Sequence, residues 1–238
     1  MNKRRVEDPE LVKKRRPQII GAAIEQFGRR GFHATTIRDI AEHAGVSIGM
    51  IYQYVQDKED LLYLSVMEVV EHYIREIGRA LDGVEDPLQR FIAIVSALAR
   101  VIDQHRAAAV LGYRESKSLS RKHMTYVMRR EREIGDMISQ CIRDCIRSGV
   151  FRKVDTEMLK YQCIIFAHNW ALNSWRFSRR ISVDTYIAKG LDLILNPVLV
   201  EPKASLPLKA PARRRRPPSS VPAAPKPRNC ARRETIAT

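Results

Sequence analysis

Cysteine is scarce in this chain of 238 residues, and the scarcity limits the chemistry that can be expected. Four cysteines occur, at positions 141, 145, 163 and 230, too few for a disulfide scaffold at this length. Cys141 and Cys145 lie one helical turn apart on an apolar face, where two thiols are usually small core residues. The six histidines show no ligand spacing, so no metal site is predicted.

Long apolar runs are missing as well. No segment approaches the ~18 apolar residues that a membrane-spanning helix needs, so no membrane partner is expected. No apolar stretch follows the basic residues of the first ten positions, MNKRRVEDPE, as it would in a secretory signal, and a cytoplasmic, nucleoid-associated location is expected. A nucleophile–base pair and a glycine-rich phosphate loop are also lacking, which argues against an enzyme and against a cofactor.

Glycine and proline are sparse between residues 10 and 200, and the alternating pattern of strands is absent there. Apolar residues instead recur at helical spacing, as in Ile20, Ala23, Ile24 and Phe27. The predicted class is all-α, with about nine helices. Residues with side chains suited to capping mark the expected helix starts at Thr36, Ser47, Asp57, Asp86, Ser120, Asp155 and Ser182.

Acidic residues are outnumbered by basic ones, 27 to 42, which gives a formal net charge of +15. Ten of the basic residues and eight of the twelve prolines follow residue 200, so 201–238 is predicted to be a disordered basic tail. Residues 1–16 are expected to form a mobile basic arm. The remaining chain is still basic, which favours a polyanionic partner.

Two short helices around Ala44-Gly45-Val46 follow the plan of a helix-turn-helix, in which a glycine permits the positive φ of the turn. Residues 20–62, IGAAIEQFGRRGFHATTIRDIAEHAGVSIGMIYQYVQDKEDLL, closely resemble the N-terminal domain of TetR/AcrR-family regulators. The resemblance implies a three-helix DNA-binding domain over 17–56. A helical ligand-binding and dimerisation domain would follow over 57–200.

The resemblance also implies which positions meet DNA. Side chains in the second helix of the motif would face the major groove or its walls, and three others would contact phosphate. The first group is Ser47, Gly49, Met50, Tyr52 and Gln53; the second is Thr36, Arg38 and Lys58. Ile48 departs from the family pattern, which often has a basic or polar residue there. Two such motifs on one duplex require a dimer on a palindromic operator.

Residues 158–177 are apolar nearly all round, which indicates burial on more than one side. A homodimer through residues 156–198 is therefore predicted. Several short stretches, among them residues 113–119 and 148–151, together with Trp170 and Trp175-Arg176-Phe177, resemble a subset of the family that senses acyl-CoA thioesters.

That resemblance implies an acyl tunnel between helices and arginines for the CoA phosphates. The candidates for the tunnel are Phe91, Val95, Met124, Met128, Phe166 and Trp170, and those for the phosphates are Arg106, Arg114, Arg121 and Arg176. A methionine and aromatic stripe is more often plain core, so both interpretations stay open.

The expected function is a ligand-responsive transcriptional repressor, released from its operator by a small hydrophobic effector such as an acyl-CoA. The alternative is a DNA-organising or cell-division factor on the same fold that has no small-molecule effector. An effector pocket of several hundred Å3 would distinguish the first from the second.

Overall fold

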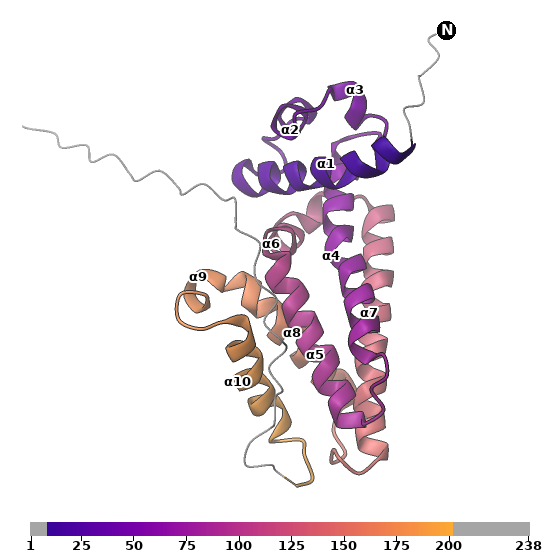
Figure 1. Ribbon diagram of the computed structural model, residues 1–238, viewed down its shortest axis with the longest axis vertical. Coiled ribbons are helices and arrows are strands. Elements are labelled where there is room, and N and C mark those ends of the chain that lie inside the picture. Colours follow the sequence, from indigo (N-terminus) through magenta and orange to yellow (C-terminus); the bar gives the residue numbers. More distant parts are fainter. Residues whose placement is uncertain (1–8, 202–238) are drawn as a thin grey trace, which may run out of the picture. The chain divides into compact units, whose positions relative to one another are not determined.

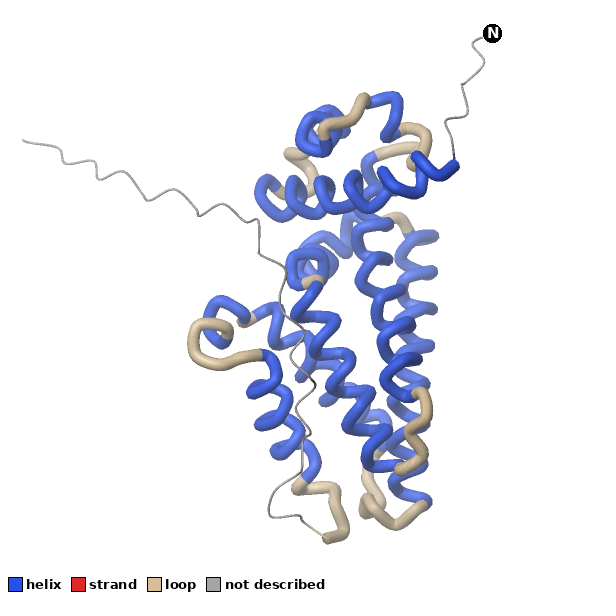
Figure 2. The backbone as a smooth tube through the Cα atoms, in the orientation of Figure 1, coloured by secondary structure: helices blue, strands red, loops and turns tan. Residues whose placement is uncertain are grey.

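The computed structural model describes residues 9–201, with side chains from residue 15 onward (Figures 1 and 2). Ten α-helices and one short 3-10 helix make up this part of the chain, so the predicted all-α class is confirmed. They are α1 Pro9–Arg30, α2 Ile37–Ala44, α3 Ile48–Ile51, α4 Lys58–Leu81, α5 Pro87–Gln104, α6 Arg106–Glu115, η1 Ser116–Ser118, α7 Arg121–Arg147, α8 Thr156–Leu172, α9 Ser174–Phe177 and α10 Val183–Leu195. The tail predicted for 201–238 lies, apart from its first residue, outside the described residues.

The predicted helix starts are confirmed by hydrogen bonds. Each of the seven side chains accepts a bond from the main-chain N–H three residues on, which satisfies a donor that the first turn leaves free. These N-caps are Thr36, Ser47, Asp57, Asp86, Ser120, Asp155 and Ser182. Gly45 ends α2 with a φ of 63°, a left-handed conformation that costs glycine little.

Three helix boundaries differ from the prediction. α1 begins at Pro9, so the arm expected over 1–16 is helical from there on, and Pro17 removes one main-chain hydrogen bond without ending the helix. α3 has four residues, and the chain continues through hydrogen-bonded turns, with Gln53 N–H donating to the carbonyl of Met50 at 3.1 Å. The segment expected to run from Asp155 to Phe177 breaks at Asn173 into α8 and α9.

Residues 17–56, predicted to bind DNA and called the head from here on, share their hydrophobic core with two helices of the second domain. Ala23 and Phe27 of α1, and Ile40 of α2, are buried there. Leu62 of α4 and Leu111 of α6 belong to the same core. α6 also packs directly on α1. A movement of α4 or α6 therefore acts on the head through close packing.

The second domain is a bundle in which α5 packs against α4, α7 and α8, and α10 covers α5 and α8. Its core includes the fully buried Phe91, Ile102 and Ile142. The ring of Phe166 on α8 lies directly on Gly190 of α10, where a side-chain carbon would collide with it. None of the described helices is long and apolar enough to cross a membrane.

Candidate DNA-binding head and regulatory sites

The start of α2 is held by a reciprocal capping box. The Thr36 hydroxyl accepts the Asp39 N–H at 3.2 Å, and the Asp39 carboxylate accepts the Thr36 N–H at 2.8 Å and its hydroxyl at 2.7 Å. These hydrogen bonds lower the pKa of Asp39 to about 2, and Arg30 assists at 2.9 Å. Thr36 is thus a helix cap whose exposed position still leaves it at the surface of the head.

The expected groove-facing residues lie on α3 and on the turn that follows it. Ser47, Gly49, Tyr52 and Gln53 are exposed, with Tyr52 at 49%. A side chain at Gly49 would meet nothing closer than the Ser47 hydroxyl at 3.9 Å, so this surface is open to an approaching duplex. Met50 differs from the other four, because it is half-buried and packs on the head core.

Lys58 occupies a different place from the one expected for a phosphate contact. Its ammonium donates to the carbonyls of Phe32, His33 and Thr35 at 2.8, 3.2 and 2.9 Å, and lies 4.5 Å from the centre of the Phe32 ring. These three bonds use its three N–H donors to hold the loop between α1 and α2. Arg38, in contrast, is exposed on α2.

A half-buried histidine joins three helices of the second domain. His168 of α8 lies 3.1 Å through Nε2 from the hydroxyl of Tyr73 on α4. Its Nδ1 lies 2.5 Å from the hydroxyl of Tyr113 on α6. Burial lowers the pKa of His168 to about 4 and raises that of Tyr73 well above 10. At neutral pH the ring is therefore uncharged, donating to one tyrosine and accepting from the other.

Three of the residues predicted to bind an effector gather around another side of α8. Trp170 is buried and donates through Nε1 to Asp103 at 2.8 Å, and Arg106 binds the same carboxylate at 2.7 Å. The ring of Tyr186 stacks on Phe166 at 4.6 Å and lies 5.0 Å from Trp170. Phe166, Trp170 and Arg106 therefore belong to one cluster of aromatic rings and charges between α5, α6, α8 and α10.

The other predicted effector residues are scattered. Phe91 is buried against Phe151 with ring centres 5.1 Å apart, at the foot of the bundle. Arg114 donates to the carbonyl of Gly28 on α1 at 3.5 Å. Met128 and Arg176 are exposed, on α7 and α9. The sequence pattern does not show that these residues lie far apart in the folded chain.

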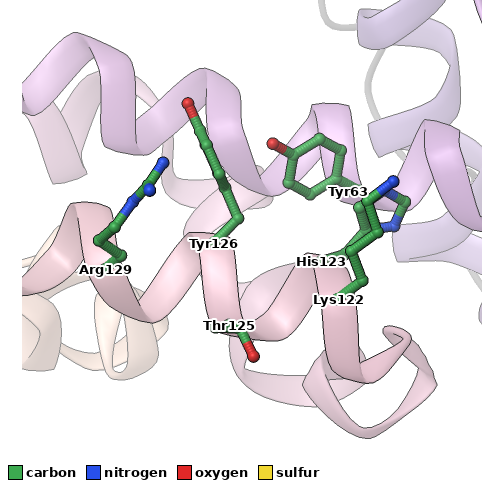
Figure 3. Close-up of a pocket in the computed structure, with 6 residues that line it drawn as sticks. All are labelled: Tyr63, Lys122, His123, Thr125, Tyr126 and Arg129. Carbon is green, nitrogen blue, oxygen red and sulfur yellow. The ribbon is translucent and has the colours of Figure 1, made fainter.

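A hollow of about 390 Å3, which no sequence pattern predicted, lies where α4 meets α7 (Figure 3). Tyr63 of α4 and five residues of α7 line it: Lys122, His123, Thr125, Tyr126 and Arg129. None of the predicted effector residues is among them. The hollow lies at the start of α4, directly after the head.

α8, α9 and α10 carry large apolar side chains that the rest of residues 15–201 leaves uncovered. Ile165, Leu193 and Trp175 are exposed by 56%, 75% and 68%. Met158, Tyr161 and Leu172 of α8 are exposed as well. Apolar side chains thus lie nearly all round this segment, as predicted: those on one side are in the core, and those on the other side are at the surface.

A helix-turn-helix head joined to a helical second domain defines a transcriptional regulator that binds DNA. The chain belongs to the tetR family of bacterial regulatory proteins: residues 19–63 match that family's N-terminal domain, and residues 84–195 match the tetracyclin repressor-like C-terminal domain. The predicted family and the prediction of a regulator rather than an enzyme are confirmed.

Among curated proteins, the HTH-type transcriptional regulator HbdR of Aromatoleum sp. (strain CIB) is 42% identical over 194 residues, covering 82% of this chain and 85% of that protein. The repressor KstR2 of Mycobacterium tuberculosis (strain ATCC 25618 / H37Rv) is 28% identical over 142 residues, 59% of this chain and 71% of its own.

Solved structures share the fold. A tetR-family regulatory protein from Rhodococcus RHA1 has a TM-score of 0.70 at 25% identity, covering 76% of this chain and 95% of that one. AibR, crystallised with isovaleryl coenzyme A and operator DNA, has a TM-score of 0.67 at 15% identity, covering 76% and 98%.

Proposed function

We propose that this chain represses transcription by binding a palindromic operator as a homodimer, and that an acyl-CoA releases it. Membership of the family supports the regulatory role. The acyl-CoA class is supported by the residues that resemble acyl-CoA sensors and by AibR, which binds isovaleryl coenzyme A on the same fold. The fatty acid metabolism regulator protein of Bacillus subtilis (strain 168) is 32% identical over 97 residues, 40% of this chain and 46% of its own.

The observation that carries the ligand response is the Tyr73–His168–Tyr113 network. It ties α6 to α4 and α8, and Leu111, two residues before Tyr113, lies in the core of the head. A ligand that separates Tyr113 from His168 would move α6, and α6 would carry the movement to α1. Such a ligand would favour a state in which the two heads no longer match the groove spacing.

The acyl group is proposed to enter beside this network, at the cluster of Arg106, Phe166 and Trp170. Its rings supply an apolar wall, and the Arg106–Asp103 pair lies next to them. His168 and Trp170 are two residues apart on α8 and therefore point to opposite sides of the helix. A ligand at the cluster would thus act on the network by displacing α8.

The operator surface is proposed to consist of the exposed residues Ser47, Gly49, Tyr52 and Gln53, with Met50 beside them. Gln53 can donate to and accept from an adenine edge, and the Tyr52 hydroxyl can reach phosphate. Thr36 and Arg38, at the start of α2, would contact the phosphate backbone of the DNA. Lys58 is left out of this surface because its donors hold the loop before α2.

The exposed apolar side chains of α8 and α10 are proposed to form the dimer interface, within residues 156–198. In the dimer, Ile165 and Leu193 would be buried against the same surface of a second copy, as expected for a two-fold symmetric contact. A repressor of this kind would act in the cytoplasm, on the nucleoid.

Operator binding in the presence of CoA thioesters tests the proposal. Genomic footprinting would identify the operator, and fluorescence anisotropy would then follow the full chain on that duplex while short-, medium- and long-chain acyl-CoAs are added. At least one thioester should weaken binding, whereas the matching free acid should not. If no thioester changes operator affinity or melting temperature, the acyl-CoA class is wrong. Binding without preference for the operator would favour the DNA-organising alternative.

A further inference from the structure

The hollow between α4 and α7 has the side chains of a stacking site. The Tyr63 ring stacks on His123 with centres 4.1 Å apart and planes 9° apart. Tyr126 stands nearly perpendicular to Tyr63, at 77° and 6.0 Å. The two tyrosine rings thus form adjoining walls that offer a flat ligand one face and one edge (Figure 3).

Cationic groups lie at both ends of these walls. The Arg129 guanidinium lies 4.8 Å from the centre of the Tyr126 ring, and Lys122 stands on the other side, beside His123 (Figure 3). Within residues 15–201, neither cation has a carboxylate partner within ion-pair distance. Two cations beside the half-buried Tyr63 and the exposed Tyr126, with no acidic residue in the lining, favour an anionic aromatic ligand.

We infer that this hollow binds an adenine nucleotide, with its base against Tyr63 and Tyr126 and its phosphates at Lys122 and Arg129. Aromatic stacking is the usual way in which proteins hold an unpaired base, and lysine and arginine are the usual phosphate ligands. The volume of about 390 Å3 lies within the range of small-ligand pockets, roughly 300–1,000 Å3.

The inference extends the proposed function and rests on it only for the source of the nucleotide, which would be the nucleotide half of an acyl-CoA. Tyr63 and Tyr73 are ten residues apart on α4, a rise of about 15 Å. An extended pantetheine arm can span that distance. The acyl group could then lie near His168 while the nucleotide occupies the hollow.

The hollow is coupled to the start of α4. His123, which supports the Tyr63 ring, binds Glu59 through Nδ1 at 2.8 Å, and Glu59 also accepts the N–H of Ser120 at 2.7 Å. Asp60 lies 3.6 Å from the other ring nitrogen. These bonds fix α7 to the first turn of α4, next to the loop that Lys58 holds. A nucleotide on Tyr63 would therefore act where the second domain meets the head.

Calorimetry on the full chain tests the site, with 3′-phosphoadenosine 5′-phosphate as the probe for the nucleotide half. The variant carries Tyr126→Ala and Arg129→Gln, two exposed positions, and Arg132→Gln on the same helix is the matched control. The variant should weaken nucleotide and CoA binding about tenfold or more, and the control should not. An acyl-pantetheine, which lacks the nucleotide, should bind the variant and the wild type equally.

The outcomes separate the two proposals. Equal nucleotide affinity in variant and wild type overturns the hollow, as does acyl-CoA binding with no contribution from the nucleotide. Hollow-dependent nucleotide binding together with an operator complex that ignores acyl-CoA supports the hollow and refutes the proposed effector. If ATP binds the hollow as tightly as the CoA nucleotide does, the ligand of the hollow is a free nucleotide and not part of an acyl-CoA. If the variant binds the operator more weakly even when no nucleotide is present, the cationic side chains of the hollow contact DNA, and the inference is overturned.

Discussion

The hydroxyl of Tyr113 on α6 lies 2.5 Å from Nδ1 of His168 on α8, although 55 residues separate the two in the chain. This bond joins the helix that touches the head to the centre of the second domain. Removal of the hydroxyl leaves one ring nitrogen of the half-buried His168 without its partner. The contribution of this bond to the free energy of unfolding can therefore be measured.

Tyr113→Phe is expected to lower the free energy of unfolding by about 1 kcal/mol, because Tyr113 is itself half exposed and water can replace part of the bond. It should also lower the acyl-CoA concentration that releases half of the operator complex, since α6 is then held less firmly. Urea denaturation and anisotropy measure the two effects. Gln104→Ala is the control, since this exposed side chain of α5 has no hydrogen-bond partner among the described residues and lies outside both the network and the proposed dimer interface. Equal shifts in both variants would refute the role of the network.

The pH dependence of stability should report His168 directly. Burial lowers the pKa of His168 in the folded protein from the usual 6.5 to about 4, so the unfolded chain binds this proton more tightly than the folded one. The stabilisation is therefore complete above pH 6.5 and is lost as the pH falls toward 4, by at most about 3 kcal/mol. Urea denaturation between pH 7 and pH 4 should show a steeper loss for the wild type than for His168→Gln. Parallel profiles would contradict the prediction.

Tyr52→Ala with Gln53→Ala is expected to abolish operator binding and to leave the dimer intact. Both side chains are exposed and hold no part of the head core, so their loss removes groove contacts alone. Anisotropy on the operator and analytical ultracentrifugation measure the two properties. Gln104→Ala, an exposed glutamine of α5, should change neither. Unchanged operator affinity in the double variant would remove α3 from the DNA surface.

Ile165→Glu is expected to dissociate the dimer. A carboxylate at this exposed position of α8 would be buried in the proposed interface without a partner, whereas in a monomer it stays in water. Sedimentation should show a monomer, and thermal denaturation should show that this monomer is still folded, with a lower melting temperature than the wild type. Met128→Glu, at an equally exposed position on α7, introduces the same charge and should leave the dimer unchanged. A dimeric Ile165→Glu protein would place the interface elsewhere.

Local signals predicted most of the fold. Caps such as Asp86 and Ser120 act within one turn of the chain, and the sequence displays the acceptor and the helix together. The start of α1 was missed because Pro17 is compatible with both a first turn and, at the cost of one bond, an interior position. The break at Asn173 was missed because the apolar pattern continues across it.

The regulatory sites could not be predicted, because their residues come from distant segments. Tyr73, Tyr113 and His168 belong to three helices, and each alone resembles a core or surface residue. The hollow depends in the same way on how Tyr63 of α4 faces Tyr126 of α7. Lys58 shows the converse: its position in the motif suggested a phosphate contact, yet the nearest acceptors are carbonyls of its own chain.

The head core includes Leu62 and Leu111, so the helix-turn-helix head is completed by helices that belong to the second domain. If recombination near residue 57 exchanged the heads of two regulators, each head would pack against the other regulator's residues at the positions of Leu62 and Leu111. The shared core would then be poorly packed. New operator preferences would then arise more readily by single substitutions on the exposed face of α3 and its turn, such as Gln53, which no buried partner constrains. The packing through which a ligand signal is proposed to pass thereby also restricts how such a regulator can change its operator.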